Sequence, residues 1–236
     1  VRDLNLGSTD ITYNALKYHV IEMYVEYTGT AYGSLLDQGV STDKEHIYST
    51  VCKLMEKQGI RVLDPIGFNN SFVLAVRENT AEKYHLKTIS DLKKVSSQLV
   101  FSPTIEFNNR NDGIVALNNA YNLKFKALSP IEGGLGYTAI DSGKCDVLTA
   151  YSTDGLLKTY HLKILEDDKN AMLSYNAIPM INESTLLEYP ELEEVLSKMT
   201  GLIDDETMRS LNYLVDQEGK TPESVARDFL KSKGLL

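Results

Sequence analysis

The stretch DVLTAYSTDG, residues 146–155, contains at 146–150 a short apolar segment of the length of one strand. Similar segments recur along the chain, separated by stretches in which apolar residues have helical spacing. This alternation of strands and helices predicts an α/β fold. The other segments expected to form strands are residues 21–24, 61–63, 72–76, 98–101 and 162–165.

The strand pattern stops in the last part of the chain, beyond Pro179. Thr221 and Pro222 supply an N-cap and a first-turn proline for a final helix, and Ser90 is expected to cap an earlier helix. We expect this helical tail to pack against a lobe that is already formed. Its three expected helices cover residues 183–199, 204–215 and 222–230.

The composition is that of a folded protein without a nucleic-acid partner. At 236 residues the chain is expected to form one large domain or two lobes that share a hinge. Its formal charge of −9 and its lack of a basic cluster argue against DNA or RNA. Its apolar runs fall far short of the roughly 20 residues that span a bilayer. Because no leader precedes Val1, a secretion signal is expected to have been removed, or the domain to come from a longer polypeptide.

The aromatic and cysteine content narrows the possible sites. The chain has 14 Tyr, 6 Phe and no Trp, so an aromatic site must be built mainly from tyrosine. Most of these tyrosines are expected to cover half-buried surfaces. Cys52 and Cys145 lie far apart without a CxxC spacing, which predicts two separate thiols rather than a disulfide or a metal site.

The common catalytic signatures are missing from the sequence. It contains no GxSxG, HExxH, Walker A or GxGxxG pattern. The four histidines lie in scattered polar segments without i, i+4 pairing. Asp167 and Asp168 indicate a polar turn, because no further acidic spacing completes a cation shell. We therefore expect no enzyme, no cofactor and no metal site.

Four groups of residues occur in an order and at spacings that resemble one known family. Each group alone is weak, but the four together are specific. The groups are LNLGST (4–9) with IEMYVEYTGT (21–30); DPIGFNNSF (64–72); EF (106–107) with RNDG (110–113) and Tyr121; and DVLTAYSTDG (146–155) with LEDDK (165–169) and YNAIP (175–179). With these residues the chain resembles the osmoprotectant receptors, the extracytoplasmic solute-binding proteins of ABC importers for glycine betaine, choline and carnitine.

The resemblance implies a bilobal type II periplasmic-binding-protein fold, in which two α/β lobes hold the ligand in a cleft between them. The chain would cross twice between the lobes, near residues 72–75 and near residues 175–179. Residues 1–73 and 176–236, including the helical tail, would form lobe I, and residues 74–175 would form lobe II.

The resemblance also implies an aromatic cage. A trimethylammonium group has no N–H to donate, so aromatic ring faces are its matching surface. The residues that match the family's motifs are Tyr27, Phe72, Tyr151 and Tyr175, each at the end of an expected strand. The alternative for each is an ordinary place in a core or on the surface. Phe72 stands where the family commonly has tyrosine, and Val25 replaces a usual proline, which predicts a pocket adapted to a different ligand.

Polar residues lie near the expected cage in the sequence. Thr30, Ser8 and Thr9 are candidates to bind a ligand carboxylate, and Ser8 with Thr9 would begin a helix whose free N–H groups favour an anion. Plain N-capping is an equal alternative for these two. Asn69 and Asn70 are expected to orient the cage, to satisfy a turn, or both. A polar network inside one lobe is expected from Glu106, Arg110, Asp112 and Asp154.

Together these patterns predict an extracytoplasmic solute-binding protein or domain of an ABC importer. Its ligand would be choline, glycine betaine, carnitine or a related betaine, and its partner would be the transporter's permease. It would be anchored at the cell membrane as a lipoprotein or fused to that permease. The alternative is the effector-binding domain of a regulator, which uses the same fold; such proteins carry a helix-turn-helix segment, and none is recognised in the sequence.

Overall fold

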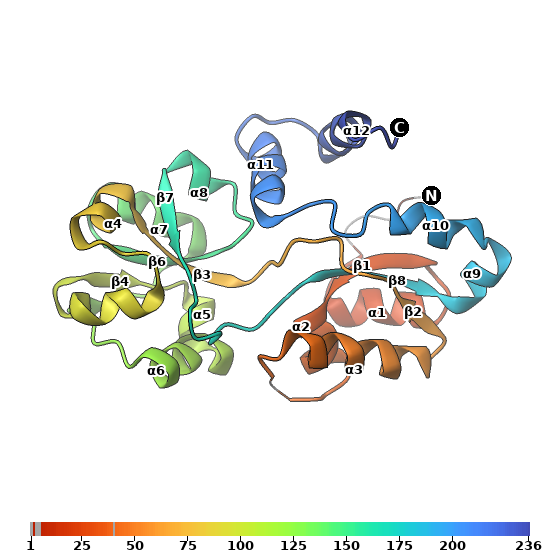
Figure 1. The fold of residues 1–236 in the computed structure, drawn as a ribbon, viewed down its shortest axis with the longest axis horizontal. Coiled ribbons are helices and arrows are strands. Elements are labelled where there is room, and N and C mark those ends of the chain that lie inside the picture. Colours follow the sequence, from red (N-terminus) through yellow and green to blue (C-terminus); the bar gives the residue numbers. More distant parts are fainter. Residues whose placement is uncertain (1, 3–5, 40) are drawn as a thin grey trace. The chain divides into compact units, whose positions relative to one another are not determined.

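The structure, a computed structural model, describes residues 2, 6–39 and 41–236 (Figure 1). The chain forms two compact units, and each is built from segments that are distant in the sequence. Unit 1 comprises Val1–Asn70 and Ser174–Asp204, and unit 2 comprises Ser71–Leu173 and Asp205–Leu236. The chain therefore passes from one unit to the other three times, not twice as the family resemblance implies.

Unit 1 contains a three-stranded antiparallel sheet in the order β1-β8-β2. Its strands are β1 (Met23–Tyr27), β2 (Ile60–Val62) and the central β8 (Ala177–Asn182), which is buried along its whole length. The helices α1 (Thr9–Lys17) and α3 (Lys44–Glu56) pack on this sheet (Figure 1). The side chains of their shared core include Tyr13, Leu16, Ile47, Val51, Met55, Ile178 and Met180.

Short helices complete unit 1. α2 (Thr28–Thr30) follows β1 directly and continues into a π-helical turn at Ala31–Leu35. After β8 the single helix expected over residues 183–199 is divided into α9 (Glu183–Glu188) and α10 (Glu191–Ser197). The division falls before Pro190, because the ring of a proline disfavours helical backbone in the residue that precedes it.

Unit 2 contains a five-stranded sheet in the order β5-β4-β6-β3-β7. β3 is antiparallel to β6 and β7, whereas β4 is parallel to β5 and β6. Successive side chains of β3 point to opposite faces, and each face has its own core. The strands are β3 (Phe72–Arg77), β4 (Val100–Ser102), β5 (Ala127–Leu128), β6 (Val147–Tyr151) and β7 (Leu162–Leu165).

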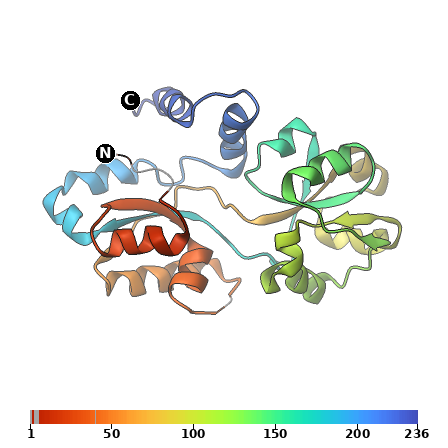
Figure 2. The same cartoon turned by 180° about the vertical axis from the view of Figure 1, so that it is seen from behind.

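Helices cover both faces of this sheet (Figure 2). On one face, Phe72, Leu74 and Val76 of β3 share a core with α5 and α6. On the other face, Ala75 shares a core with Tyr137 of α7. The helices of unit 2 are α4 (Glu78–Tyr84), α5 (Ile105–Asn109), α6 (Ala116–Tyr121), α7 (Gly133–Asp141), α8 (Leu156–Thr159), α11 (Asp205–Asp216) and α12 (Pro222–Ser232).

The expected strands are present with shifted ends, but β5 and β8 are not expected from the sequence pattern. β8 is not recognised in the sequence because it contains Pro179, and proline lacks the N–H that a residue of a central strand normally donates. The carbonyl of Pro179 accepts a hydrogen bond from Leu63 N at 2.9 Å. In an antiparallel sheet the N–H and C=O of one residue point to the same side of the strand. The nitrogen of Pro179 therefore faces the β2 side, where the pairing of β2 with β8 has already ended at Val62 and no donor is needed for the strand.

One helix cap differs from the prediction and one agrees with it. Thr88, not Ser90, caps a 3₁₀ helix at Ile89–Lys94: Asp91 N donates to Thr88 Oγ1 at 3.3 Å, and Thr88 N donates to Asp91 Oδ2 at 3.0 Å. These reciprocal bonds form a capping box, which Ser90 cannot make because Lys93, three residues later, has no acceptor side chain. Thr221 is confirmed as the cap of α12, since Ser224 N donates to its Oγ1 at 3.2 Å.

The helical tail also differs from the expectation that it returns to lobe I. Residues 205–236 group with unit 2. Arg209 and Asn212 of α11 donate hydrogen bonds to the backbone carbonyls of Ser152 and Thr153 in that unit. An amphipathic helix can pack on either lobe, so its periodicity does not determine which lobe it joins.

Gly67 and Gly59 of unit 1 provide a test of the packing around the last segment of that unit. Both have positive φ, at 130° and 72°. A Cβ on Gly67 would lie 2.7 Å from Ile203 O, whereas one on Gly59 would meet nothing within 4 Å. We expect Gly59→Ala to lower the free energy of unfolding by about 1 kcal/mol and Gly67→Ala by roughly 3 kcal/mol. Denaturant unfolding of both variants checks this, and equal losses would contradict it.

Candidate functional site

Tyr27 is the last residue of β1, where it lies opposite Ala177 of β8. Its ring meets Phe68 edge-on, with centroids 6.3 Å apart and an interplanar angle of 76°. The Asn70 side chain hydrogen-bonds its hydroxyl, while burial raises the pKa of Tyr27. The ring is half-buried, so it is fixed in place but retains exposed surface.

Tyr175 lies against α2 in the same unit. A Cβ added to Gly29 would lie 2.8 Å from Tyr175 Cε1 and 2.9 Å from its Cδ1, so the ring packs directly on the glycine backbone. Tyr175 N donates to Asn69 Oδ1 at 2.6 Å, and Asn70 N donates to Tyr175 O at 3.0 Å. The sequence EYTGT thus has its glycine where a tyrosine ring needs close access to the backbone.

Thr28 ties the two tyrosine segments together. Its N–H donates to Asn176 O at 2.9 Å, and its Oγ1 accepts from Asn176 N at 3.0 Å. Unit 1 therefore brings together three motifs that are distant in the sequence, at Tyr27, Asn69-Asn70 and Tyr175. Asn69 and Asn70 bond the backbone of Tyr175, and the Asn70 side chain also bonds Tyr27.

The candidate carboxylate-binding residues are less closely connected to this group of tyrosines and asparagines. Thr30 ends α2 and is half-buried. Ser8 is the N-cap residue of α1 and Thr9 its first residue, but the Ser8 side chain makes no capping hydrogen bond. Neither Ser8 nor Thr9 takes part in the hydrogen bonds that join Tyr27, Asn69 and Tyr175. Residues 4 and 5 of the same motif lie outside the described residues.

Phe72 and Tyr151 face each other in unit 2. Phe72 begins β3, Tyr151 ends β6, and the two are paired in register. Their rings stack with centroids 4.9 Å apart, and Phe107 meets Phe72 edge-on at 5.2 Å. The Arg110 guanidinium lies 5.7 Å from the Phe72 centroid. Phe72 is only 6% exposed, so it supports the half-buried Tyr151 instead of offering an open face itself.

The expected polar network lies inside unit 2. Tyr151 OH donates to Glu106 Oε2 at 2.7 Å, and Glu106 pairs with Arg110 at 3.1 Å. Arg110 also pairs with Asp112 at 2.7 Å. Asp154 accepts from Tyr151 N at 3.2 Å, so both ends of Tyr151 are held. Four polar residues thus determine the position of one aromatic ring.

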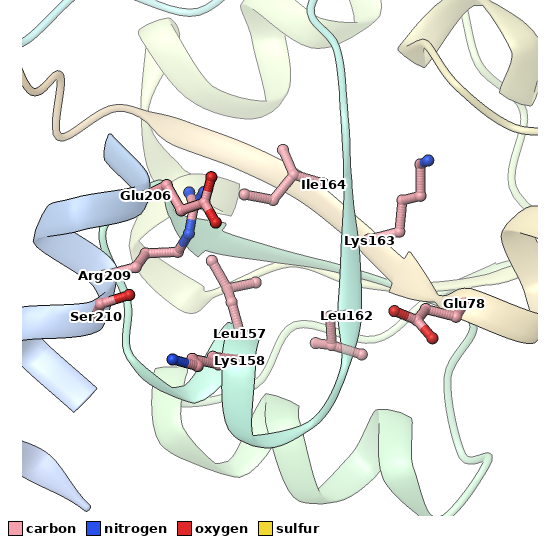
Figure 3. A pocket seen from close by; sticks show the side chains of 9 residues that line it. All are labelled: Glu78, Leu157, Lys158, Leu162, Lys163, Ile164, Glu206, Arg209 and Ser210. Carbon is pink, nitrogen blue, oxygen red and sulfur yellow. The ribbon is translucent and has the colours of Figure 1, made fainter. Parts of the chain in front are cut away.

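A separate pocket of about 440 Å³ lies in unit 2 (Figure 3). Its walls come from α4, α8, β7 and α11, and they contain no aromatic side chain and none of the predicted site residues. A pocket of this kind lacks the ring faces that suit a quaternary ammonium group. The lining residues are Glu78, Leu157, Lys158, Leu162, Lys163, Ile164, Glu206, Arg209 and Ser210.

Among residues 2, 6–39 and 41–236, no three His, Cys, Asp or Glu side chains gather as metal ligands would. Cys52 and Cys145 are free thiols, as predicted. No helix in the described ranges is long and apolar enough to cross a bilayer.

Several residues that hold the site are not singled out by sequence reasoning. Phe68 contacts the Tyr27 ring, and Thr28 hydrogen-bonds the backbone of Asn176. Gly29 provides the backbone surface on which the Tyr175 ring packs. Their signal is present in the motifs EYTGT and GFNN, where only the tyrosine and the asparagines receive a predicted role. Glu26 is buried beside them, and burial raises the pKa of its carboxyl.

Two α/β units, with tyrosine rings held at the ends of β1 and β6, define a solute-binding protein of the bilobal class. The family described as the substrate binding domain of ABC-type glycine betaine transport systems matches residues 1–232. The chain belongs to this family. Its members are not enzymes; they act outside the cytoplasm, bind small quaternary-ammonium solutes and work with permease components. The alternative of a regulator's effector domain is not favoured.

Named relatives agree with this assignment. The chain is 36% identical to the carnitine transport binding protein OpuCC of Listeria monocytogenes, covering 98% of this chain and 76% of that protein. It is 34% identical to the ergothioneine transport permease/ergothioneine binding protein EgtU of Helicobacter pylori, covering 97% of this chain and 41% of that protein. A crystal structure of a glycine betaine/carnitine/choline ABC transporter protein superposes with a TM-score of 0.93 at 35% identity, covering 97% of this chain and 85% of that one.

The hydroxyl of Tyr151 gives a testable electrostatic property. Its pKa is raised, first by burial and then by the Glu106 carboxylate that accepts its hydrogen bond. A raised pKa keeps the hydroxyl protonated, so Tyr151→Phe should leave the tyrosinate absorbance change below about pH 11 unaltered. Glu106→Gln should lower the pKa of Tyr151, although burial still holds that pKa above the ordinary value for tyrosine. If Tyr151→Phe removed one tyrosine from the absorbance change in this pH range, the raised pKa of Tyr151 would be contradicted.

Proposed function

We propose that the chain binds its quaternary-ammonium solute with the ring faces of Tyr27 and Tyr175 in unit 1 and of Tyr151 in unit 2. Phe72 supports Tyr151, and Asn69 and Asn70 orient the two rings of unit 1. The observation that carries this proposal is the packing of the Tyr175 ring on the backbone of Gly29. Asn69 bonds Tyr175, and the neighbouring Asn70 bonds Tyr27. A half-buried tyrosine that is held by its neighbours can offer a ring face to the solute while its side chain stays ordered.

The chemistry of the solute explains the choice of tyrosine. Its methyl groups carry diffuse positive charge and no N–H, so the faces of rings bind it better than single acceptors do. Each ring contributes on the order of 0.5–2 kcal/mol. Three rings thus supply a substantial share of the roughly −8 kcal/mol of micromolar binding.

A carboxylate on the solute would be bound by hydroxyls and backbone donors of unit 1. Thr30 follows the Gly29 seat of Tyr175, and Ser8 with Thr9 stands at the positive end of α1. The Ser8 side chain makes no capping bond, which supports its use as a ligand contact. Choline lacks a carboxylate, so these three residues favour glycine betaine or carnitine over choline.

We also propose that the domain is held at the membrane, as a lipoprotein or as part of a permease polypeptide. The relative from Helicobacter pylori, named as both permease and binding protein, supports the second form, because this chain corresponds to 41% of its length. Fractionation of cells that express the full-length gene tests the proposal. The product should sediment with membranes, and a product found entirely in the soluble fraction would exclude both forms.

The ligand class is tested by calorimetry with glycine betaine, choline and carnitine. At least one of these should bind with a Kd of about 1–100 μM and should be recovered unchanged after incubation. No binding of any of these three solutes, together with tight binding of an amino acid or a sugar, would contradict the proposed ligand class.

The ring assignments are tested by single substitutions. Tyr151→Ala and Tyr175→Ala should each weaken binding about tenfold, roughly 1.4 kcal/mol, and the Phe variants should weaken it less. Gly29→Ala should also weaken binding, because its Cβ would lie 2.8 Å from both Tyr175 Cε1 and the backbone oxygen of Ser174 and would displace this segment. Gly33→Ala is the matched control, since its Cβ would meet only Gly39 O at 3.5 Å. Unchanged affinity in both tyrosine-to-alanine variants, with the fold intact, would remove these rings from the site.

A further inference from the structure

The turn that follows Tyr151 is held by the helical tail. Arg209 of α11 donates from Nη1 to Ser152 O at 2.6 Å, and Asn212 donates from Nδ2 to Thr153 O at 2.9 Å. Ser152 and Thr153 are only 4% and 6% exposed, so these carbonyls lie in a buried stretch of backbone. Loss of a side-chain donor would leave a buried acceptor without that partner, which is unfavourable.

The contact between this turn and α11 is unusually close. A Cβ on Gly155 would lie 2.8 Å from both Cα and N of Tyr213, which are backbone atoms of α11. The φ of Gly155 is −61°, so the glycine is needed for this approach and not for its own conformation. Figure 3 shows Arg209 projecting from α11 toward the strands of unit 2.

The same turn is held from its other side by the start of unit 2. Ser71 N donates to Ser152 Oγ at 3.1 Å, and Ser152 N donates to Ser71 O at 2.9 Å. Ser71 Oγ in turn donates to Leu173 O at 2.6 Å. Ser71, Leu173 and Asp205 are the residues of unit 2 at which the chain enters or leaves it, and α11 begins at Asp205.

We propose that α11 is a positioning element for ligand binding, in which Arg209 and Asn212 fix the turn at Ser152–Thr153 and thereby the ring of Tyr151. This inference rests on the proposed function, because Tyr151 is a ligand contact only there. Arg209 and Asn212 are positioning residues that act through Tyr151. The tail therefore contributes to affinity without contacting the solute.

The test compares Arg209→Met with Arg227→Met. Arg227 is an exposed arginine of the same tail, and its ion pair with Glu223 at 3.5 Å is within α12. With glycine betaine, choline and carnitine as probes, Arg209→Met and Asn212→Ala should each weaken the binding that wild type shows about fivefold. Arg227→Met should leave it unchanged. Val225→Ala, which removes a buried side chain of α12, should lower the melting temperature without this loss of affinity.

A double-mutant cycle separates positioning from general stability. In the Tyr151→Ala background, Arg209→Met should weaken binding little further, since the ring through which Arg209 acts is absent. The same fivefold loss in both backgrounds, or wild-type affinity in Arg209→Met, would overturn the inference. A similar loss of affinity in Val225→Ala, which only destabilises the tail, would do the same.

Hydrogen exchange gives a readout that needs no ligand. Backbone amides of residues 151–155 should exchange faster in Arg209→Met than in wild type or Arg227→Met. If wild type binds none of the three probes, the proposed function is wrong, and exchange still decides whether α11 holds the turn. Unchanged exchange in Arg209→Met would overturn the positioning role.

Discussion

Phe72 and Tyr151 face each other across β3 and β6, and the stacking of their rings connects the core of unit 2 to its proposed binding surface. Phe72 belongs to the core, whereas Tyr151 is half-buried. The pairing depends on strand register, because a slip of one residue would turn Tyr151 to the opposite face of the sheet. The hydrogen bond from Tyr151 OH to Glu106 depends on the same register, because it needs the ring on this face of the sheet.

Unit 1 has a corresponding constraint in the approach of Tyr175 to Gly29. The ring packs on the glycine backbone, and Asn69 and Asn70 bind the backbone of Tyr175 on its N–H and C=O sides. In both units a half-buried tyrosine is held by neighbours that are not themselves proposed to contact the solute. Such preorganisation limits the ordering that binding would otherwise require.

The sequence predicts much of the fold, because its strands are short apolar segments and its site motifs lie at their ends. The resemblance identifies Tyr27, Asn69 and Tyr175 but assigns Tyr175 to lobe II, whereas the structure places all three in unit 1. It does not predict the burial of Phe72, since a ring at a strand end can face either the core or the solvent. β8 is missed because Pro179 is typical of a break, and its tolerance depends on where β2 ends. The place of α11 depends on Gly155 and on two backbone carbonyls, none of which has a periodic signal.

The central claim is that ring faces select the positive charge of the solute. The most direct measurement compares glycine betaine with 3,3-dimethylbutanoate, and choline with 3,3-dimethylbutan-1-ol, in which carbon replaces the charged nitrogen at nearly the same shape. Calorimetry of the wild-type protein should show the member with the charged nitrogen binding more than about tenfold tighter in at least one pair, because the electrostatic attraction of the trimethylammonium group to the tyrosine faces is lost when carbon replaces nitrogen. Equal affinity for the two members of each pair would contradict the account.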